Sequence, residues 1–180
     1  MIRSSGWYRY AWDPVEGCKN KCWYCYAAKR ISDFENVKFF EERLDEPEKV
    51  KPTRIFVNHL SDIMGDWIPK LWIRLVIGVC QLNPLHTFIW MTKNPARYKD
   101  FEFSSNCILG VTIESLEYWD RAKTMEGLNN RKMCSIEPIL GSFKGYDFSQ
   151  FEFVVIGELD GKGNYKNYRT VKHKKIYYKL

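Results

Sequence analysis

Short apolar runs, typical of buried strands, alternate along the chain with stretches of helical periodicity. The strand-like runs lie at residues 8–12, 55–58, 87–92, 107–113, 133–136 and 153–156. We expect helices after the second, third and fourth of these runs and another over residues 26–34, whereas residues 35–51 are charged and irregular. This alternation is typical of an α/β protein with a mainly parallel sheet.

The clearest helix follows Asp66. Its apolar side chains recur three or four residues apart, and Pro69 suits a first turn. These side chains are Ile68, Leu71, Trp72, Leu75, Val76 and Val79. One face of the helix must therefore lie on the sheet. Cys80, beside that face, and Cys107 and Cys134, within strand-like runs, are predicted to be small core residues.

Polar side chains follow most of the predicted strands at their downstream ends. They are Asp13, Asn58, Ser61, Asp62, Thr92, Lys93, Thr112, Glu114, Ser135, Glu137 and Glu158. In a parallel α/β sheet or barrel these ends gather at one rim, where ligands bind. Together the side chains predict a binding site at that rim, although each alone also fits a turn or a cap.

The composition indicates one folded domain, because 45% of the 180 residues are hydrophobic and 28% are charged. Residues 1–12 have no apolar run long enough for a secretory signal, and Arg74 interrupts the most apolar stretch, residues 71–80. We therefore expect a cytoplasmic protein with no membrane partner. In that reducing compartment, clustered cysteines serve as metal ligands or redox groups more often than as disulfides.

The net charge of +6 is concentrated at the carboxyl end of the chain. Residues 162–180 carry six lysines and Arg169, with four tyrosines among them and no acidic residue. We therefore divide the chain into a core domain, residues 1–161, and a basic tail or helix, residues 162–180. Such a tail can neutralise phosphates while its rings stack on bases, so nucleic acid is an expected partner. A solubilising surface segment explains the same charge.

The strongest chemical signal is a group of three cysteines, Cys18, Cys22 and Cys25, within eight residues. Thiolates select zinc or iron–sulfur clusters. A structural zinc site needs four ligands, so His59 or a distant cysteine would have to complete the set. Three cysteines alone fit best a [4Fe-4S] cluster that leaves one iron open to another ligand.

The spacing Cys18-x-x-x-Cys22-x-x-Cys25, with Tyr24 before the last cysteine, resembles the signature of radical S-adenosylmethionine (SAM) enzymes. In that family the three cysteines hold a [4Fe-4S] cluster, SAM chelates the open iron, and reduction cleaves SAM to a 5'-deoxyadenosyl radical. The resemblance implies a partial (β/α)6 barrel, which agrees with the strands predicted above.

A closer resemblance covers most of the chain. Five segments are similar to the phage Gp37/Gp68 family of radical SAM proteins, also called three-Cys-motif proteins. The segments are WDPVEGC (12–18), IFVNHLSD (55–62), MTKNP (91–95), LGVTIE (109–114) and SIEPILG (135–141). That family looks distantly like spore photoproduct lyase, a DNA-repair enzyme. Its members are often encoded beside a partner, so a further protein partner is also expected.

The resemblance implies roles for several strand-end residues. The backbone at Tyr24 is expected to face the adenine of SAM, and Lys93 to pair with its carboxylate as a point charge. Thr112 and Glu114 occupy the strand on which related enzymes hold the ribose hydroxyls, a role suited to a carboxylate acceptor.

Four further residues complete the expected cofactor contacts. Asn58 closes the second strand, and Ser61 and Asp62 stand where many relatives carry Gly-Gly-Glu near the cofactor amine. Glu137 is expected to accept a hydrogen bond from the cofactor or, alternatively, from the substrate. In this interpretation, the aromatic residues near the cysteines line the cavity that holds SAM or stack on a base of the substrate. Packing in the core explains their presence equally well. They are Trp7, Tyr8, Tyr10, Trp12, Trp23 and Tyr26.

These inferences predict an enzyme that cleaves SAM at a [4Fe-4S] cluster and acts on a nucleic acid or a nucleotide. We expect it to receive its electron from a donor such as flavodoxin or ferredoxin. The alternative is a zinc-dependent nucleic-acid-binding module without catalysis, in which the same cysteines are structural and the tail binds the nucleic acid.

Overall fold

A computed structural model of the chain describes residues 6–159 and, for residues 165–172, the backbone alone. The chain is built on a sheet of seven strands in the order β1-β4-β5-β6-β7-β8-β9. The first six run parallel, and β9 pairs antiparallel with β8 at one edge. The strands are β1 (Tyr10–Trp12), β4 (Arg54–Val57), β5 (Thr87–Thr92), β6 (Cys107–Thr112), β7 (Arg131–Ile136), β8 (Phe153–Leu159) and β9 (Tyr165–Lys172).

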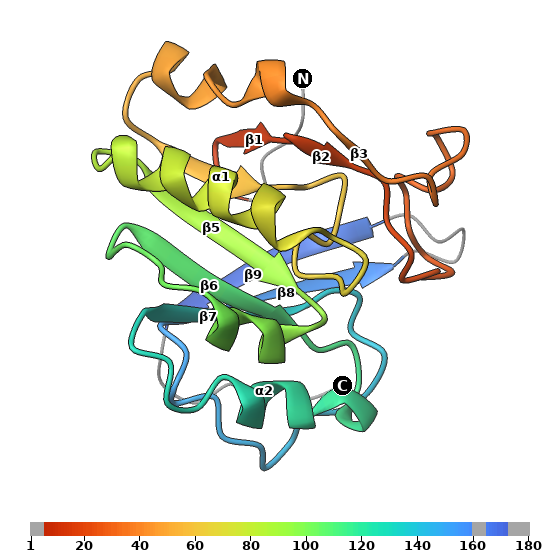
Figure 1. The fold of residues 1–180 in the computed structure, drawn as a ribbon. Coiled ribbons are helices and arrows are strands. Elements are labelled where there is room, and N and C mark those ends of the chain that lie inside the picture. Colours follow the sequence, from red (N-terminus) through yellow and green to blue (C-terminus); the bar gives the residue numbers. More distant parts are fainter. Residues whose placement is uncertain (1–5, 160–164, 173–180) are drawn as a thin grey trace.

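The six parallel strands curl into half of a barrel, with the helices on the outer side (Figure 1). This confirms the expected α/β class and the partial (β/α)6 barrel. Each parallel strand lies beside the strand of this sheet that precedes it in the chain. The strands run parallel because every connection returns the chain to the same end of the sheet. The carboxyl ends of the six strands therefore share one rim, as the strand-end residues predicted.

The helices of the described residues are short apart from the first α-helix. They are α1 (Lys70–Leu82), α2 (Asp120–Thr124) and the 3-10 helices η1 (Glu41–Arg43), η2 (Glu46–Lys49), η3 (Pro95–Asp100) and η4 (Leu116–Tyr118). Helix α1 is the one predicted after Asp66, but Pro69 is extended and precedes the first turn. In the described part of the chain, no helix combines the length and the apolar character that crossing a membrane requires.

Alternate side chains of the strands pack on opposite faces of the sheet. The outer face joins α1 and α2 in the larger core, where Cys80, Cys107 and Cys134 are buried as predicted. The inner face carries a second apolar cluster. Its buried members are Trp7, Tyr8, Ile89, Ile108, Met133 and Val155. Because both faces are covered, the central strands read as continuous apolar runs in the sequence.

The segment that carries the three clustered cysteines is a loop, and the helix predicted over residues 26–34 is absent. The loop is closed at its base by β2 (Val15–Glu16) and β3 (Lys38–Phe39), which pair antiparallel. The amide of Cys18 donates to the carbonyl of Phe34 at 2.8 Å, so the chain must turn back on itself and forms successive turns instead of a helix. Gly17 permits this closure, since its φ is 97° and a Cβ would lie 2.9 Å from the carbonyl oxygen of Phe34.

The basic segment at residues 162–180 is described only in part. Its residues 165–172 form strand β9, where the sequence favoured a tail or a helix. Residues 162–164 and 173–180 lie outside the described residues. The division into a core domain and a tail, and the binding role of the tail, therefore stay predictions.

Two glycine substitutions test how tightly the inner face is packed. A Cβ at Gly110 of β6 would lie 2.5 Å from the carbonyl oxygen of Trp90 and 2.8 Å from Cε of Met91. We expect Gly110→Ala to lower the free energy of unfolding by about 1–3 kcal/mol, because the backbone of β5 cannot move away without breaking the sheet.

Gly78→Ala is the matched control. Gly78 lies inside α1 and a Cβ there meets nothing within 4 Å. We expect this change to raise the free energy of unfolding by about 0.5–1 kcal/mol through helix propensity alone. Urea unfolding followed by circular dichroism measures both variants, and equal stability of the two would contradict the packing described for the inner face.

Candidate functional site

A cavity of about 260 Å³ opens at the rim formed by the carboxyl ends of the parallel strands. The cysteine loop, the loop after β4 and the ends of β5, β6 and β7 all contribute to its wall. Ten of the eleven site residues proposed from the sequence line it, and Glu114 lies behind the wall. The ten are Cys18, Cys22, Cys25, Tyr24, Asn58, Ser61, Asp62, Lys93, Thr112 and Glu137.

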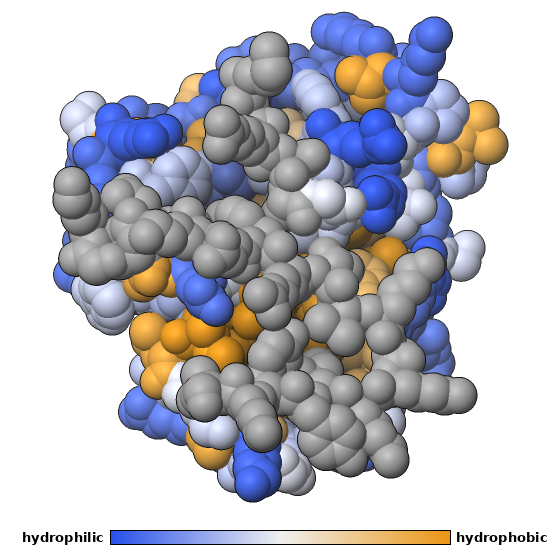
Figure 2. Space-filling view, turned by 180° about the vertical axis from the view of Figure 1, so that it is seen from behind, coloured by the Kyte–Doolittle hydropathy of each residue, from blue (hydrophilic) through white to orange (hydrophobic). Residues whose placement is uncertain are grey.

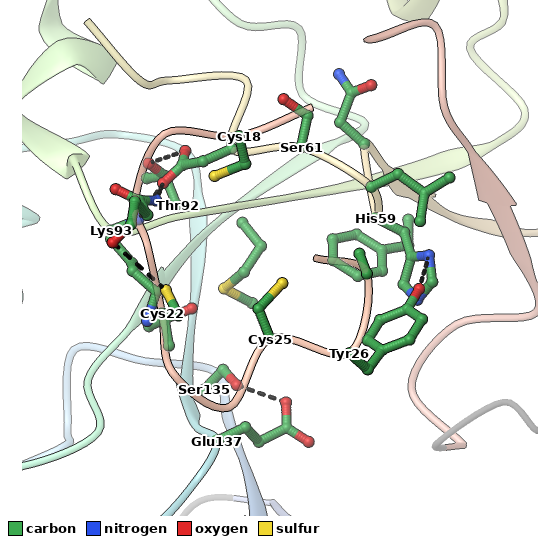
Figure 3. Close-up of a pocket in the computed structure, with 18 of the residues that line it drawn as sticks. Cys18, Cys22, Cys25, Tyr26, His59, Ser61, Thr92, Lys93, Ser135 and Glu137 are labelled. Carbon is green, nitrogen blue, oxygen red and sulfur yellow. Dashed lines mark hydrogen bonds between the residues drawn. The ribbon is translucent and has the colours of Figure 1, made fainter. Parts of the chain in front are cut away.

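The three clustered cysteines face this cavity together (Figure 3). Each is partly exposed, in contrast to the three buried core cysteines. The amide of Ala28 lies 3.5 Å from Sγ of Cys25, an N–H···S contact of the kind that tunes sulfur ligands of iron–sulfur clusters. Burial raises the pKa of the Cys18 thiol to about 11, so this thiol keeps its proton until a metal displaces it.

The thiols are not gathered around a single point. Within the part of the chain that the structure describes, no three His, Cys, Asp or Glu side chains are placed to hold one metal ion. In a [4Fe-4S] cluster each cysteine binds a different iron, so its ligands lie further apart than those of one zinc ion. Three thiols around a shared cavity are a donor set of the kind that such a cluster requires.

His59, considered as a fourth zinc ligand, is engaged elsewhere. Its ring nitrogens lie 2.6 and 2.8 Å from the hydroxyl of Tyr26, and both residues line the cavity. Burial lowers the pKa of His59 to about 4, so the ring is neutral at neutral pH and can accept this hydrogen bond. The pair forms the wall beside Cys25 in Figure 3.

The carboxylate of Asp62 fixes the cysteine loop to the barrel. One oxygen accepts from the hydroxyl of Thr92 (2.6 Å) and the amide of Met64 (3.2 Å). The other accepts from the side-chain amide of Asn20 (2.9 Å) and the backbone amide of Lys93 (3.0 Å). Asp62 was predicted to bind the cofactor, and the structure gives its oxygens four protein donors. In this structure the Asp62 side chain positions the cysteine loop.

Ser61 has a similar positioning contact. Its hydroxyl donates to the carbonyl of Gly17 at 2.7 Å, immediately before the first clustered cysteine. Ser61 also lines the cavity, and its hydroxyl oxygen can accept a further hydrogen bond. The amide of Gly17 in turn donates to the carbonyl of Leu60 at 3.1 Å. The loop after β4 thus holds the start of the cysteine loop from two sides.

Lys93 lies between the cavity and a buried carboxylate. Its ammonium group forms an ion pair with Glu114 and donates to the hydroxyl of Tyr24 at 2.5 Å. Glu114 is 4% exposed and also accepts from the Tyr24 hydroxyl and, at 2.8 Å, from Arg121. Burial lowers the pKa of Lys93 to about 8, so the ammonium form remains the major one at neutral pH.

This network bears on the roles expected for Glu114, Thr112 and Tyr24. Glu114, expected to hold the ribose hydroxyls, is paired behind the wall with Lys93 and Arg121. No sequence pattern singles out Arg121. Thr112 does line the cavity and remains available to a ligand there. The side chain of Tyr24 is buried in the network, while its position in the cysteine loop keeps its backbone near the cavity.

Three polar atoms of the cavity lining are buried without a hydrogen-bond partner among the described residues. They are Nδ2 of Asn58, Oε1 of Glu137 and Nε1 of Trp7. The other side-chain atom of Asn58, Oδ1, accepts from the amide of Val15 at 2.9 Å, which fixes Nδ2 as a free donor. Buried polar groups are nearly always paired, so three such atoms on residues that line one cavity mark it as a candidate binding site.

The aromatic residues near the cysteines divide between the cavity and the cores. Trp7, Tyr8 and Tyr26 line the cavity, which is one of the two alternatives that the sequence left open, and Trp7 and Tyr8 also belong to the buried inner cluster. Trp12 is buried in the larger core, and Trp23 is 67% exposed and takes no part in the lining. Phe56 and Met91 also line the cavity, although their strands read as ordinary core in the sequence. In β4 and β5, Phe56 and Met91 alternate with fully buried residues, and this alternation could have indicated that they lie on the other face of the sheet.

The donor set fits an iron–sulfur cluster with a bound SAM. Three thiols line the cavity, which also holds Lys93, paired with Glu114, and an amide donor of Asn58 without a partner among the described residues. The three cysteines would hold the cluster, and Lys93, Asn58 and Thr112 would contact the cofactor.

Comparison with solved structures supports the same architecture. Spore photoproduct lyase complexed with dinucleoside spore photoproduct has a TM-score of 0.61 and 17% identity, covering 75% of this chain and 47% of that chain. A cysteine-to-alanine mutant of spore photoproduct lyase, also with dinucleoside spore photoproduct, has a TM-score of 0.59 and 17% identity, with 73% and 46% covered. The chain thus spans about half the length of these structures, and the likeness shows a shared fold.

Comparison of the sequence with curated proteins gives no match. The family model described as "Protein of unknown function (DUF5131)" matches residues 4–173. Since that match covers nearly the whole sequence, including the cysteine loop and every strand of the sheet, the chain belongs to the DUF5131 family.

Proposed function

We propose that the chain is a radical SAM enzyme, with a [4Fe-4S] cluster held by Cys18, Cys22 and Cys25. The observation that carries this proposal is the placement of all three thiols on one cavity at the carboxyl ends of the parallel strands. The three core cysteines lie elsewhere and are fully buried, which leaves three ligands for a cluster with one open iron. The similarity of five sequence segments further leads us to propose a relationship with the phage Gp37/Gp68 family.

The residues of the chain would orient SAM and exclude water around it. When bound and reduced, the cluster supplies the electron that cleaves SAM to methionine and a 5'-deoxyadenosyl radical. Lys93 would leave part of its contact with Glu114 to pair with the carboxylate of SAM, and Asn58 Nδ2 is a donor with no competing partner in the described chain. Glu114 remains paired with Arg121 when Lys93 moves, so no buried carboxylate is left without a cation.

The apolar inner face of the half-barrel would protect a radical from side reactions. The cavity is bounded by Phe56 and Met91 and by the cluster that contains Trp7 and Tyr8. A primary-carbon radical abstracts hydrogen from most C–H groups that it meets, so the site must hold one substrate C–H close and keep other groups away.

We propose a nucleic acid or a nucleotide as the substrate. The support is the fold shared with spore photoproduct lyase, whose solved complexes contain dinucleoside spore photoproduct. The basic, tyrosine-containing segment at residues 162–180 adds positive charge suited to a phosphate backbone. A protein such as flavodoxin or ferredoxin would supply the electron, and the reducing cytoplasm would keep the three thiols available for iron.

Replacement of a clustered cysteine tests the metal assignment. We expect the wild-type protein, reconstituted anaerobically, to bind about four irons and four sulfides and to convert SAM to 5'-deoxyadenosine. Cys22→Ala should lose the cluster and at least 100-fold in 5'-deoxyadenosine formation, measured by chromatography, because only two thiols remain.

Cys134→Ala is the matched control, since Cys134 is buried in β7 away from the cavity. It should keep its iron content and its activity. A colourless wild-type protein with one zinc per chain would contradict the proposal and would favour the zinc-dependent binding module.

Replacement of Lys93 tests the cofactor contact separately from the metal. Lys93→Ala should weaken SAM binding about tenfold, or about 1.4 kcal/mol, because one charge-assisted contact to the carboxylate is lost. The visible absorbance of the cluster should stay unchanged. The control Lys99→Ala removes an exposed lysine of η3 and should bind SAM like the wild type. Equal SAM affinity of Lys93→Ala and Lys99→Ala, measured by equilibrium dialysis, would show that Lys93 does not contact the cofactor.

A further inference from the structure

We propose that Glu137, Trp7, Tyr8 and Phe56 form a substrate subsite that binds a nucleobase. This inference rests on the proposed function, because it names the part of the same cavity that takes the substrate. The four residues line the cavity together. They come from the segment before β1, from β4 and from the end of β7, so the subsite is assembled by the barrel rather than by one loop.

The aromatic part of the subsite is a cluster of three rings. The ring centroids of Trp7 and Tyr8 are 4.6 Å apart, those of Trp7 and Phe56 4.9 Å, and those of Tyr8 and Phe56 5.2 Å. The rings are inclined to one another by 52–71°, and all three residues line the cavity. Base–aromatic stacking contributes about 1–3 kcal/mol for each base, which makes a flat heterocycle a suitable occupant.

The polar part of the subsite is a carboxyl group held in one orientation. Ser135 donates to Oε2 of Glu137 at 2.6 Å, while Oε1 is buried and has no partner among the described residues. A Cβ at position 157 would lie 3.0 Å from Cγ and Oε1 of Glu137, so Gly157 of β8 leaves the space that the carboxyl group occupies. The group is therefore fixed by its neighbours, and one of its oxygens is left for a ligand.

The chemistry of the free groups matches the edge of a base. Glu137 Oε1 accepts from a ring or exocyclic N–H, and the unpaired Nε1 of Trp7 donates to a ring nitrogen or a carbonyl oxygen. Burial raises the pKa of Glu137 to about 7, so its carboxyl also serves as a donor in the protonated form. A nucleobase combines such donors and acceptors with a stacking face, whereas a sugar or a phosphate has no flat ring.

Glu137, the polar member of the subsite, lies away from Cys18, Ser61 and Lys93. In Figure 3, Glu137 and Ser135 lie at one end of the cavity, and Cys18 and Ser61 lie at the opposite end. Lys93 and Thr92 occupy a side wall. The adenine of SAM is nevertheless itself a nucleobase, so the experiment must separate a substrate base from the cofactor.

Nucleoside binding to the full chain, with its cluster reconstituted anaerobically, tests the subsite. Isothermal titration calorimetry is performed with deoxyadenosine, deoxyguanosine, deoxycytidine and thymidine, and with 2-deoxyribose 5-phosphate as a probe without a base. We expect at least one nucleoside to bind and the sugar phosphate not to bind. Glu137→Gln and Phe56→Leu should each weaken that nucleoside about tenfold, because one removes a charged acceptor and the other a stacking ring. Glu117→Gln, an exposed change in η4, should bind like the wild type.

Titrations in the presence of SAM identify the occupant. A substrate subsite requires that saturating SAM leaves nucleoside binding in place and that Glu137→Gln changes SAM affinity less than twofold. Displacement of the nucleoside by SAM, or loss of SAM affinity in Glu137→Gln, would overturn the inference in favour of the cofactor adenine.

Failure to bind any of the four nucleosides, or equal binding by all variants, would also overturn the inference. Failure of the proposed function has a different signature. In that case the wild type takes up no iron or binds no SAM, whatever the nucleoside titrations show.

Discussion

The buried carboxylate of Asp62 is the group on which the arrangement of the site depends. It is 6% exposed and accepts from Asn20 in the cysteine loop and from Thr92 and Lys93 at the end of β5. A buried charge is costly unless its oxygens are paired, so carboxylate and donors hold one another in place. The cysteine loop has no regular secondary structure beyond its base at β2 and β3, and this carboxylate helps to set its position relative to the barrel rim, together with the contacts of Ser61 and Tyr24.

Lys93 connects this anchor to a second buried carboxylate. Its backbone amide donates to Asp62, and its side chain pairs with Glu114 on the next strand. Breaking a buried ion pair on one side leaves an uncompensated charge, and Arg121 prevents that for Glu114 whenever Lys93 turns toward the cavity. Under the proposed function, the backbone of Lys93 would stay fixed while its ammonium group changes partners. Such a side chain can meet a carboxylate ligand without disturbing the rim.

Much of this arrangement could be predicted from the sequence, because periodicity is a local property. The apolar runs gave the parallel strands, and the position of Asp62, Lys93 and Thr112 after those runs placed them at one rim. The turns at residues 26–34 were missed because Cys18 bonds to Phe34, a contact that depends on loop closure and not on helix propensity. The partner of Glu114 was missed for a similar reason, since Arg121 comes from the following helix and nothing in its local sequence marks it.

The distribution of unsatisfied polar atoms separates a ligand site from a packed core. Six side-chain atoms in the described residues are buried without a partner, and three of them, on Trp7, Asn58 and Glu137, belong to residues that line one cavity. Each such atom lowers the stability by about 1–3 kcal/mol in the absence of a ligand. An apolar residue of similar shape at the same position would avoid this loss. Proteins depart from satisfied packing mainly at functional sites. Asn58 and Glu137 approach the cavity from different strands, so a ligand that paired with both would span the rim, which is the geometry expected when a cofactor and a substrate share a chamber.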